Sequence, residues 1–314
     1  MNTPLKTTLE IARLQHSERI LSKSQQDAML LTGPGLSECW QAHAKRQMVS
    51  LPASCVLAAL ADGVSLSPQA AFASRSFLQQ LNTQFLNTQF GGGSGAPFSA
   101  IASALPQLVR HSHRLWQKQC LRPDTRGASS TLAALLIRGQ QVSVVNIGDS
   151  RVWRLRHVDG ALQCQQLSHD HTLWQQMLDA GEVAHTGEQP ASFYQDLTQC
   201  LTLGDAHDDV CADDALDSSE DFVNSDEDTD SPVVPEQDWL HSWQGAALPG
   251  DIWLLATDGL HGCITGFELQ NYWQAEKTIT ENLNHLYAAW SASGGSDDIS
   301  LMAMRFICPI MKNL

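Results

Sequence analysis

The chain contains 314 residues, of which 43% are hydrophobic, a size and composition that fit one large globular domain or two of ordinary size. No run approaches the roughly 20 apolar residues that a membrane helix needs, and the N-terminal residues lack the basic start and apolar stretch of a secretory signal. We therefore expect a cytoplasmic protein without a membrane partner.

The formal charge of −15 is concentrated in one segment. Residues Asp205 to Asp238 contain 14 of the 34 acidic residues, and no Lys or Arg occurs between Arg156 and Lys277. Outside that segment, 20 acidic residues face 19 basic ones, so no basic surface indicates a nucleic-acid partner. The segment also has few large apolar side chains to offset the entropy of ordering, which predicts a flexible insertion at about 205–238 within a single domain of residues 1–314.

The expected elements follow in chain order. Apolar residues at helical spacing predict helices near 68–87 and 98–120, with a loop at Gly91 to Gly95 between them. Between residues 131 and 156, three β-rich runs broken by turn residues predict an antiparallel meander. Residues 172–180 are expected to form a helix that ends at Gly181, and residues 266–275 and 278–291 two more. Residues 251–256 and 299–306 are expected to be buried strands. Because helices and strands do not alternate regularly, the pattern favours an α+β architecture with largely antiparallel sheet.

Three aspartates stand at the ends of apolar β-like runs. Asp62 follows such a run and precedes Gly63, Asp258 follows another and precedes Gly259, and Asp297 comes just before a third. A strand end holds a side chain rigidly, and Asp-Gly permits a sharp turn with a free carbonyl. An isolated Asp-Gly pair is more often a plain turn, whereas several converging carboxylates would form an oxygen-rich site for Mg²⁺ or Mn²⁺.

The chain resembles the metal-dependent phosphatases of the PPM type, also called type 2C, over nearly its whole length. The motifs that carry the resemblance occur in the family's order: Gln26-Asp27-Ala28, Ala61-Asp62-Gly63, Ala73-Ser74, Gly127-Ala128-Ser129-Ser130-Thr131-Leu132, Asn146-Ile147-Gly148-Asp149-Ser150-Arg151, Leu167-Ser168-His169-Asp170-His171, Leu201-Thr202-Leu203-Gly204, Pro249-Gly250-Asp251, Ala256-Thr257-Asp258-Gly259-Leu260 and Ser296-Asp297-Asp298-Ile299-Ser300. Each motif alone is a moderate signal, and the ordered set is a strong one.

The resemblance implies a fold of two antiparallel β-sheets packed as a sandwich and flanked by pairs of α-helices. It also implies two divalent cations, Mn²⁺ or Mg²⁺. Asp62 would bridge them, with the carbonyl of Gly63, and Asp258 and Asp297 would complete the shell of one metal. Asp27 would act near the second metal through water, and in the family Asp149 can join Asp258 in a third, weaker site. The catalytic residues would be Asp62, Asp258 and Asp297.

The implied activity is hydrolysis of phosphoserine and phosphothreonine in proteins, reversing the action of a partner Ser/Thr kinase. A water between two cations has its pKa lowered towards neutrality, so it can attack phosphorus as hydroxide without a covalent enzyme intermediate. The chain fits this mechanism because it has neither a Gly-x-Ser-x-Gly motif nor the cysteine loop of thiol phosphatases.

Two departures from the family pattern concern the substrate. Where many members have an Arg that holds phosphate, this chain has Ser22, and Lys23 or Arg19 would have to take that role. Many members have His or Met two residues after the bridging Asp and then two glycines, whereas here Val64, Ser65 and Leu66 follow Gly63. The proton for the leaving group would then come from a metal-bound water or another side chain.

These departures leave alternatives open. The chain could be a catalytically weak or inactive phosphatase-fold regulatory or binding protein, although a scaffold has no need for three mutually repelling carboxylates. A calcium-responsive module that uses the acidic segment fits less well, because the segment lacks the spaced acidic loop of such sites. The acidic segment itself is either a solvated insertion or a device that selects substrates by charge.

Two His-x-His pairs could suggest metal. His111 and His113 lie two apart in an expected helix, so their side chains point in different directions and we expect both at the surface. His169 and His171 are expected to have structural roles.

Overall fold

The computed structural model describes residues 7–17, 25–40, 44–90, 101–184, 195–204, 239–264 and 266–307. Lys23, Arg19, Ser22 and the acidic segment at 205–238 lie outside the described residues, as does the expected loop at Gly91 to Gly95. No helix in the described part of the chain is long and apolar enough to cross a membrane.

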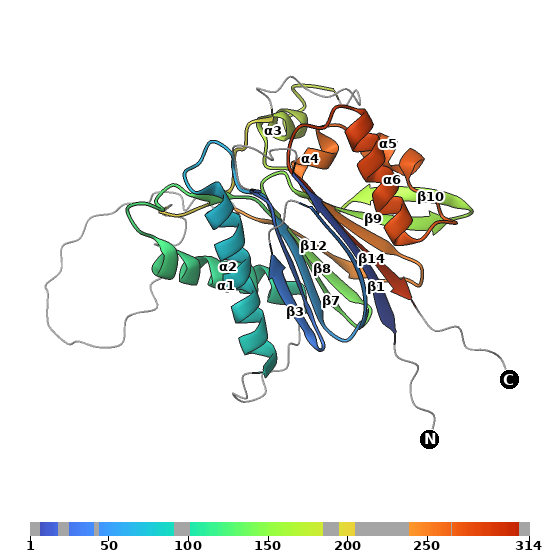
Figure 1. Ribbon diagram of the computed structural model, residues 1–314, viewed down its shortest axis with the longest axis horizontal. Coiled ribbons are helices and arrows are strands. Elements are labelled where there is room, and N and C mark those ends of the chain that lie inside the picture. The colour runs from blue at the N-terminus through green and yellow to red at the C-terminus, as the bar shows by residue number, and fades with distance from the viewer. Residues whose placement is uncertain are drawn as a thin grey trace, which may run out of the picture.

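Two six-stranded sheets form the centre of the molecule (Figure 1), and all pairings within them are antiparallel. The strand order of the first sheet is β10 (Ala161–Gln166), β9 (Arg151–Val158), β13 (Ile252–Ala256), β14 (Ile299–Ile307), β1 (Thr8–His16) and β4 (Ala44–Pro52). The order of the second sheet is β12 (His241–Ala246), β8 (Gln141–Ile147), β7 (Leu132–Arg138), β5 (Val56–Ala61), β2 (Ala28–Gly33) and β3 (Leu36–Trp40). A short pair, β6 (Ser129–Ser130) with β11 (Leu201–Thr202), lies apart from both sheets.

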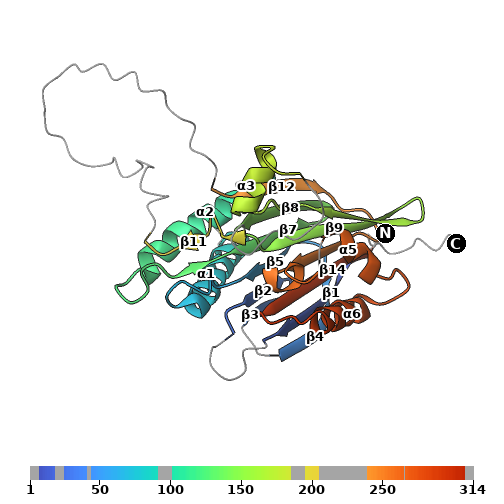
Figure 2. The same ribbon diagram turned by 90° about the horizontal axis from the view of Figure 1, so that it is seen from above.

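Helices cover the outer face of each sheet, as Figures 1 and 2 show. The helices α1 (Ala70–Phe90) and α2 (Ile101–Cys120) pack on the second sheet, and α5 (Gly266–Tyr272) and α6 (Ile279–Ala292) pack on the first. The short helices α3 (Leu173–Asp179) and α4 (Asp258–His261) lie at one end of the sandwich. The expected four-layer arrangement of helices, two sheets and helices is confirmed.

The four-layer arrangement explains why the sequences of β5 and β13 are continuously apolar. Leu57, Ala59 and Ala61 of β5 face α1 and α2, whereas Val56, Ala58 and Leu60 face the other sheet. In β13, Trp253 and Leu255 face the second sheet, whereas Ile252, Leu254 and Ala256 face α5 and α6. Strands buried on both faces are apolar at every position rather than at every second one.

The expected meander is only half right. Strands β7 and β8 form a hairpin, but β9 pairs with β10 and β13 in the other sheet. The chain crosses between sheets at Gly148, which has a φ of 86° and so adopts a backbone conformation that side chains disfavour. An ideal Cβ at Gly148 would lie 2.7 Å from Cγ2 of Thr131, so the crossing also needs glycine for space.

Most expected helices lie close to their observed bounds. Helix α5 ends at Tyr272 rather than at residue 275, whereas α3 begins after its cap Thr172 and is followed by Gly181 at a φ of 71° as expected. His113 was expected at the surface, but it is buried and its ring packs against Trp116 and Trp239. The reason is that His113 lies on the face of α2 that packs against the second sheet.

Replacing Gly148 with alanine should destabilise the protein more than the same change at Gly160. Both glycines have a positive φ, but nothing lies within 4 Å of an ideal Cβ at Gly160. We expect Gly160→Ala to lower the free energy of unfolding by about 1 kcal/mol, and Gly148→Ala by clearly more because it also displaces Thr131. Urea denaturation of both variants measures the difference, and equal losses would show that the contact with Thr131 is unimportant.

Candidate active site

The sequence-predicted aspartates meet at one end of the sandwich. Asp62 follows β5, Asp258 follows β13, and Asp27 precedes β2. Since neighbouring strands run antiparallel, the end of β5 and the start of β2 lie at the same edge, and Ala61 is paired with Ala28 there. Asp62 comes from the second sheet and Asp258 from the first, so the site lies where the two sheets face each other.

Asp62 is held by its backbone. Its N–H donates to Oγ1 of Thr131 (3.1 Å), and its carbonyl accepts hydrogen bonds from the N–H of Thr131 (2.8 Å) and from Oγ of Ser130 (2.9 Å). The next residue, Gly63, passes so close to α1 that an ideal Cβ would lie 2.4 Å from the carbonyl oxygen of Ala70. The Asp-Gly pair therefore lies where the backbone after β5 passes close to the start of α1. Asp62 is half-buried, and these contacts hold its backbone in place.

Asp27 is fully buried beside it. Oγ1 of Thr257 donates to its Oδ2 (2.9 Å), and Nε2 of Gln15 donates to its carbonyl oxygen (3.1 Å). The other carboxylate oxygen, Oδ1, is buried and has no hydrogen-bond donor among the described residues. Thr257 directly precedes Asp258, so one hydroxyl links the Asp27 carboxylate to the start of α4.

The electrostatics of these three groups are those of an acidic cluster. Burial, then Asp298 and Asp258, raise the pKa of Asp27 to about 8. Burial, then Asp27 and Asp258, raise the pKa of Asp62 well above its usual value. Carboxyl groups whose pKa is raised by burial and by neighbouring carboxylates are stabilised in the ionised form by a bound cation.

The donor set fits a hard divalent cation. Mg²⁺ and similar cations use one or two carboxylates and keep several waters, and the uncompensated Oδ1 of buried Asp27 is an oxygen of the required kind. Within the described residues, no three His, Cys, Asp or Glu side chains converge as a ready ligand set around one ion. Carbonyl oxygens, such as that of Gly63, and water molecules would therefore complete the coordination shell of such a cation.

The neighbouring pair Asp297 and Asp298 has divided roles. Asp297 is half-exposed, and its Oδ1 accepts a hydrogen bond from the N–H of Asp298 (2.8 Å). Asp298 is buried, and it accepts hydrogen bonds from Oγ of Ser17 and from the N–H of Gln26 (2.8 Å). Sequence reasoning assigned a role to Asp297 and missed Asp298, which anchors the turn before Asp27. The doubled aspartate was the only available signal.

Gly259 brings the Asp258 and Asp298 segments together. An ideal Cβ at Gly259 would lie 2.0 Å from the carbonyl oxygen of Asp298, so no other residue fits between them. Asp258 itself is half-buried at the first position of α4. Both Asp-Gly pairs thus have glycine because a neighbouring backbone approaches closely, and each places its aspartate at the same edge.

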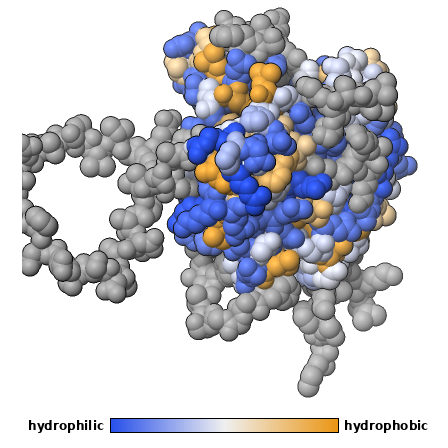
Figure 3. Space-filling model, turned by 60° about the vertical axis from the view of Figure 1, so that its left-hand side comes forward, coloured by the Kyte–Doolittle hydropathy of each residue, from blue (hydrophilic) through white to orange (hydrophobic). Residues whose placement is uncertain are grey.

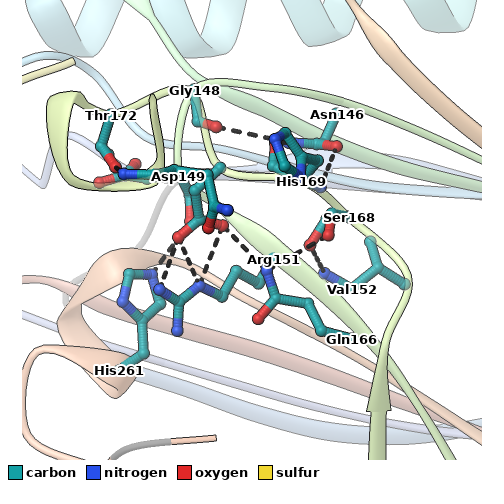
Figure 4. Close-up of polar contacts among 12 residues, drawn as sticks. Asn146, Gly148, Asp149, Arg151, Val152, Gln166, Ser168, His169, Thr172 and His261 are labelled. Atoms are coloured by element: carbon teal, nitrogen blue, oxygen red, sulfur yellow. Dashed lines mark hydrogen bonds and ion pairs between the residues drawn. The ribbon is translucent and has the colours of Figure 1, made fainter. Parts of the chain in front are cut away.

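Asp149 lies in an adjoining network, drawn in Figure 4. Its pKa is raised well above the usual value by burial and then by Asp258 and Asp170. Nε2 of His261 donates to its carbonyl oxygen (3.0 Å), and burial and Arg151 lower the pKa of His261 to about 3, which keeps that ring neutral. The structure thus places Asp149 close enough to Asp258 for the two charges to interact.

Polar contacts fix the turn that contains Asp149. The N–H of Gly148 donates to Nδ1 of His171 (3.0 Å), and Nδ2 of Asn146 donates to the carbonyl oxygen of His169 (2.7 Å). Nε of Arg151 donates to both carboxylate oxygens of Asp170 (3.1 and 2.9 Å) (Figure 4). His169 and His171 therefore have structural partners here.

Replacing Thr131 with valine should loosen the Asp62 turn. The Thr131 hydroxyl accepts from the N–H of Asp62 and contacts Oγ of Ser150 at 2.7 Å, and valine removes both partners while keeping the shape. Leaving buried polar groups unpaired costs about 1 to 3 kcal/mol, so urea denaturation should show a loss of that order for Thr131→Val. Thr131→Ser, the control, should lose much less, and similar losses for both would mean that the methyl group matters rather than the hydroxyl.

Without divalent cations the protein should become less stable as pH rises from about 4 to about 8. The raised pKa values of Asp27, Asp62 and Asp149 mean that the folded state keeps protons that the unfolded chain, with ordinary carboxyl groups, has already released. Each retained proton lowers the free energy of unfolding by up to about 1.4 kcal/mol per pH unit. Urea denaturation in EDTA at several pH values measures this slope.

Asp27→Asn should make that slope shallower, because one of the raised groups no longer titrates. The exposed Asp159, in the β9–β10 turn at the far end of the sheet, provides the control Asp159→Asn. A slope unchanged in Asp27→Asn would show that Asp27 does not retain a proton in the folded protein.

Comparisons with known proteins agree with this geometry. The serine/threonine phosphatase stp of Listeria monocytogenes is 25% identical over 180 residues, which cover 57% of each chain. PstP of Mycobacterium tuberculosis is 31% identical over 154 residues, which cover 48% of this chain and 28% of PstP. The matched regions thus span little more than half of the first relative and less of the second.

Solved structures share the fold. The catalytic domain of PstP, crystallised in complex with two manganese ions, superposes with a TM-score of 0.61 at 20% identity and covers 96% of this chain and all of that domain. Stp1 of Staphylococcus aureus superposes with a TM-score of 0.65 at 14% identity, covering 97% of this chain and 98% of Stp1. The family model described as protein phosphatase 2C matches residues 42–292, which is most of the chain and includes Asp62, Asp149 and Asp258. The chain therefore belongs to the protein phosphatase 2C family.

Proposed function

We propose that this protein is a metal-dependent phosphatase that hydrolyses phosphoserine and phosphothreonine in proteins. The observation that carries the proposal is the cluster of Asp27, Asp62 and Asp258 at the edge where both sheets end, in which Asp258 raises the pKa of both Asp27 and Asp62. Relatives in the same family are named serine/threonine phosphatases, and one solved relative contains two manganese ions.

The proposed cofactors are two divalent cations, Mn²⁺ or Mg²⁺. Asp62 would hold both, the carbonyl of Gly63 would add a further oxygen, Asp258 and Asp297 would complete the shell of one cation, and Asp27 would act near the other through water. Asp149, beside Asp258, is the proposed ligand of a third, weaker site. Bound cations activate water for attack on phosphorus and stabilise the negative charge that develops on the phosphate oxygens.

The residues of the chain would orient and protect this chemistry. Thr131 and Ser130 fix the direction of Asp62, Thr257 holds Asp27, and Asp298 fixes the turn that precedes Asp27. Preorganised groups of this kind need no rearrangement as charge develops, which is where electrostatic catalysis gains its effect. Lys23 and Arg19, outside the described residues, stay the proposed phosphate-binding groups.

The remaining proposals concern the cellular context. We propose that the substrates are phosphoproteins modified by a cognate Ser/Thr kinase and that the protein acts in the cytoplasm. We also propose that residues 1–314 work as one PPM-type domain with an insertion at about 205–238.

A phosphatase assay with Asp-to-Asn variants tests the function. We expect the wild type to hydrolyse a phosphothreonine peptide with Mn²⁺ or Mg²⁺ and not in EDTA, because the acidic cluster needs cations to act. Asp62→Asn and Asp258→Asn should lower kcat/KM by at least about a hundredfold, whereas the control Asp159→Asn should retain wild-type activity.

The outcomes separate the possible readings. Activity that persists in EDTA or in Asp62→Asn would exclude the metal mechanism. Absence of activity with every cation would instead indicate a phosphatase-fold binding protein without turnover.

A further inference from the structure

A loop of residues 64–69 follows Asp62 and Gly63 and leads into α1; we call it the Leu66 loop. Leu66 at its tip is 99% exposed, and Ser65, Pro68 and Gln69 are exposed as well. Single exposed leucines are ordinary on proteins, and Figure 3 shows several hydrophobic patches separated by hydrophilic surface on the face that it displays. Exposure of Leu66 therefore matters only if its position and rigidity give it something to contact.

The Leu66 loop is fixed on both sides of its tip. The N–H of Val64 donates to the carbonyl of Ser129 (3.0 Å), and the N–H of Ser67 donates to the carbonyl of Val64 (2.8 Å). Oγ of Ser67 accepts from the N–H of Ser129 (3.1 Å). Oγ of Ser65 donates to Oε1 of Gln26 (2.8 Å). A short loop with these hydrogen bonds holds its tip in one position. A binding partner therefore does not have to offset the entropy of ordering the loop.

The tip is close to the proposed reaction site. Gly63 and Ala70, at the two ends of the loop, are in contact, so the loop is closed at its base. Leu66 is three residues from Gly63, which limits the distance between their Cα atoms to about 11 Å. An extended peptide advances about 3.3 Å per residue, so a side chain two or three positions from the phosphorylated residue can reach the tip.

The Leu66 loop is uncharged, and its fully exposed tip is apolar. Residues 64–69 read Val-Ser-Leu-Ser-Pro-Gln and contain no ionisable side chain. The acidic cluster beside them would instead attract cations. The occupant that suits Leu66 is thus an apolar side chain, carried on the same peptide as the phosphate.

We propose that Leu66 is a specificity-determining residue that contacts an apolar side chain two or three positions from the phosphoserine or phosphothreonine of the substrate. This inference rests on the proposed phosphatase function and names the class of its substrates. Covering a fully exposed leucine removes apolar area from water, and one hydrophobic contact of this size discriminates substrates by about tenfold.

Two phosphothreonine peptides test the proposal. They differ only in having leucine or serine at the second and third positions on both sides of the phosphothreonine. With Mn²⁺, we expect wild-type kcat/KM to be about tenfold higher for the leucine peptide than for the serine peptide. In Leu66→Ser the ratio should fall to about one, and p-nitrophenyl phosphate, which has no flanking residues, provides a reference for the chemical step.

Leu248→Ser is the matched control. Leu248 is also an exposed leucine, but it precedes β13 whereas Asp258 follows that strand, so it lies at the opposite end of the sheet. Its variant should keep the wild-type ratio, and thermal unfolding checks that both variants fold.

Each outcome has one meaning. A ratio that is unchanged in Leu66→Ser, or that falls equally in Leu248→Ser, overturns the role of Leu66 while the phosphatase function stands. A wild type that hydrolyses neither the peptides nor p-nitrophenyl phosphate overturns the proposed function, and this inference with it.

Discussion

Repulsion between carboxylates at one end of the sandwich is the constraint on which the rest of the site depends. Asp258 raises the pKa of both Asp27 and Asp62, and Asp27 raises that of Asp62, so bringing these groups together costs free energy that the fold must supply. The strands that place them, β5 and β13, are buried on both faces and apolar throughout. Their packing offsets the repulsion, and the repulsion in turn is what favours a bound cation.

Hydroxyl and amide groups position the aspartates of this cluster. Basic partners would instead neutralise the aspartates. Thr131, Ser130 and Thr257 hold the acidic turns through neutral hydrogen bonds. In the described part of the chain, Arg151 lies at the outer side of this cluster, where its guanidinium pairs with Asp170. The carboxyl groups of the cluster therefore remain available to a bound cation.

Much of the fold could be predicted from the sequence, because fully buried strands and amphipathic helices leave clear patterns. The place of β9 could not, because β8 and β9 look like neighbours along the chain and only the turn at Gly148 sends them to different sheets. In the site, the Asp-Gly pairs identified Asp62 and Asp258 as candidates. Asp298 and His261 were missed, because their roles depend on which backbone groups the fold brings to them.

The crossing at Gly148 also has a mechanical consequence. Asp62 belongs to one sheet and Asp258 to the other, so a cation shared between them would fasten the two sheets at this edge, next to the covalent crossing. Sliding of one sheet over the other would then stretch the cation's coordination shell. By linkage, packing between the sheets that resists this shear would also favour cation binding.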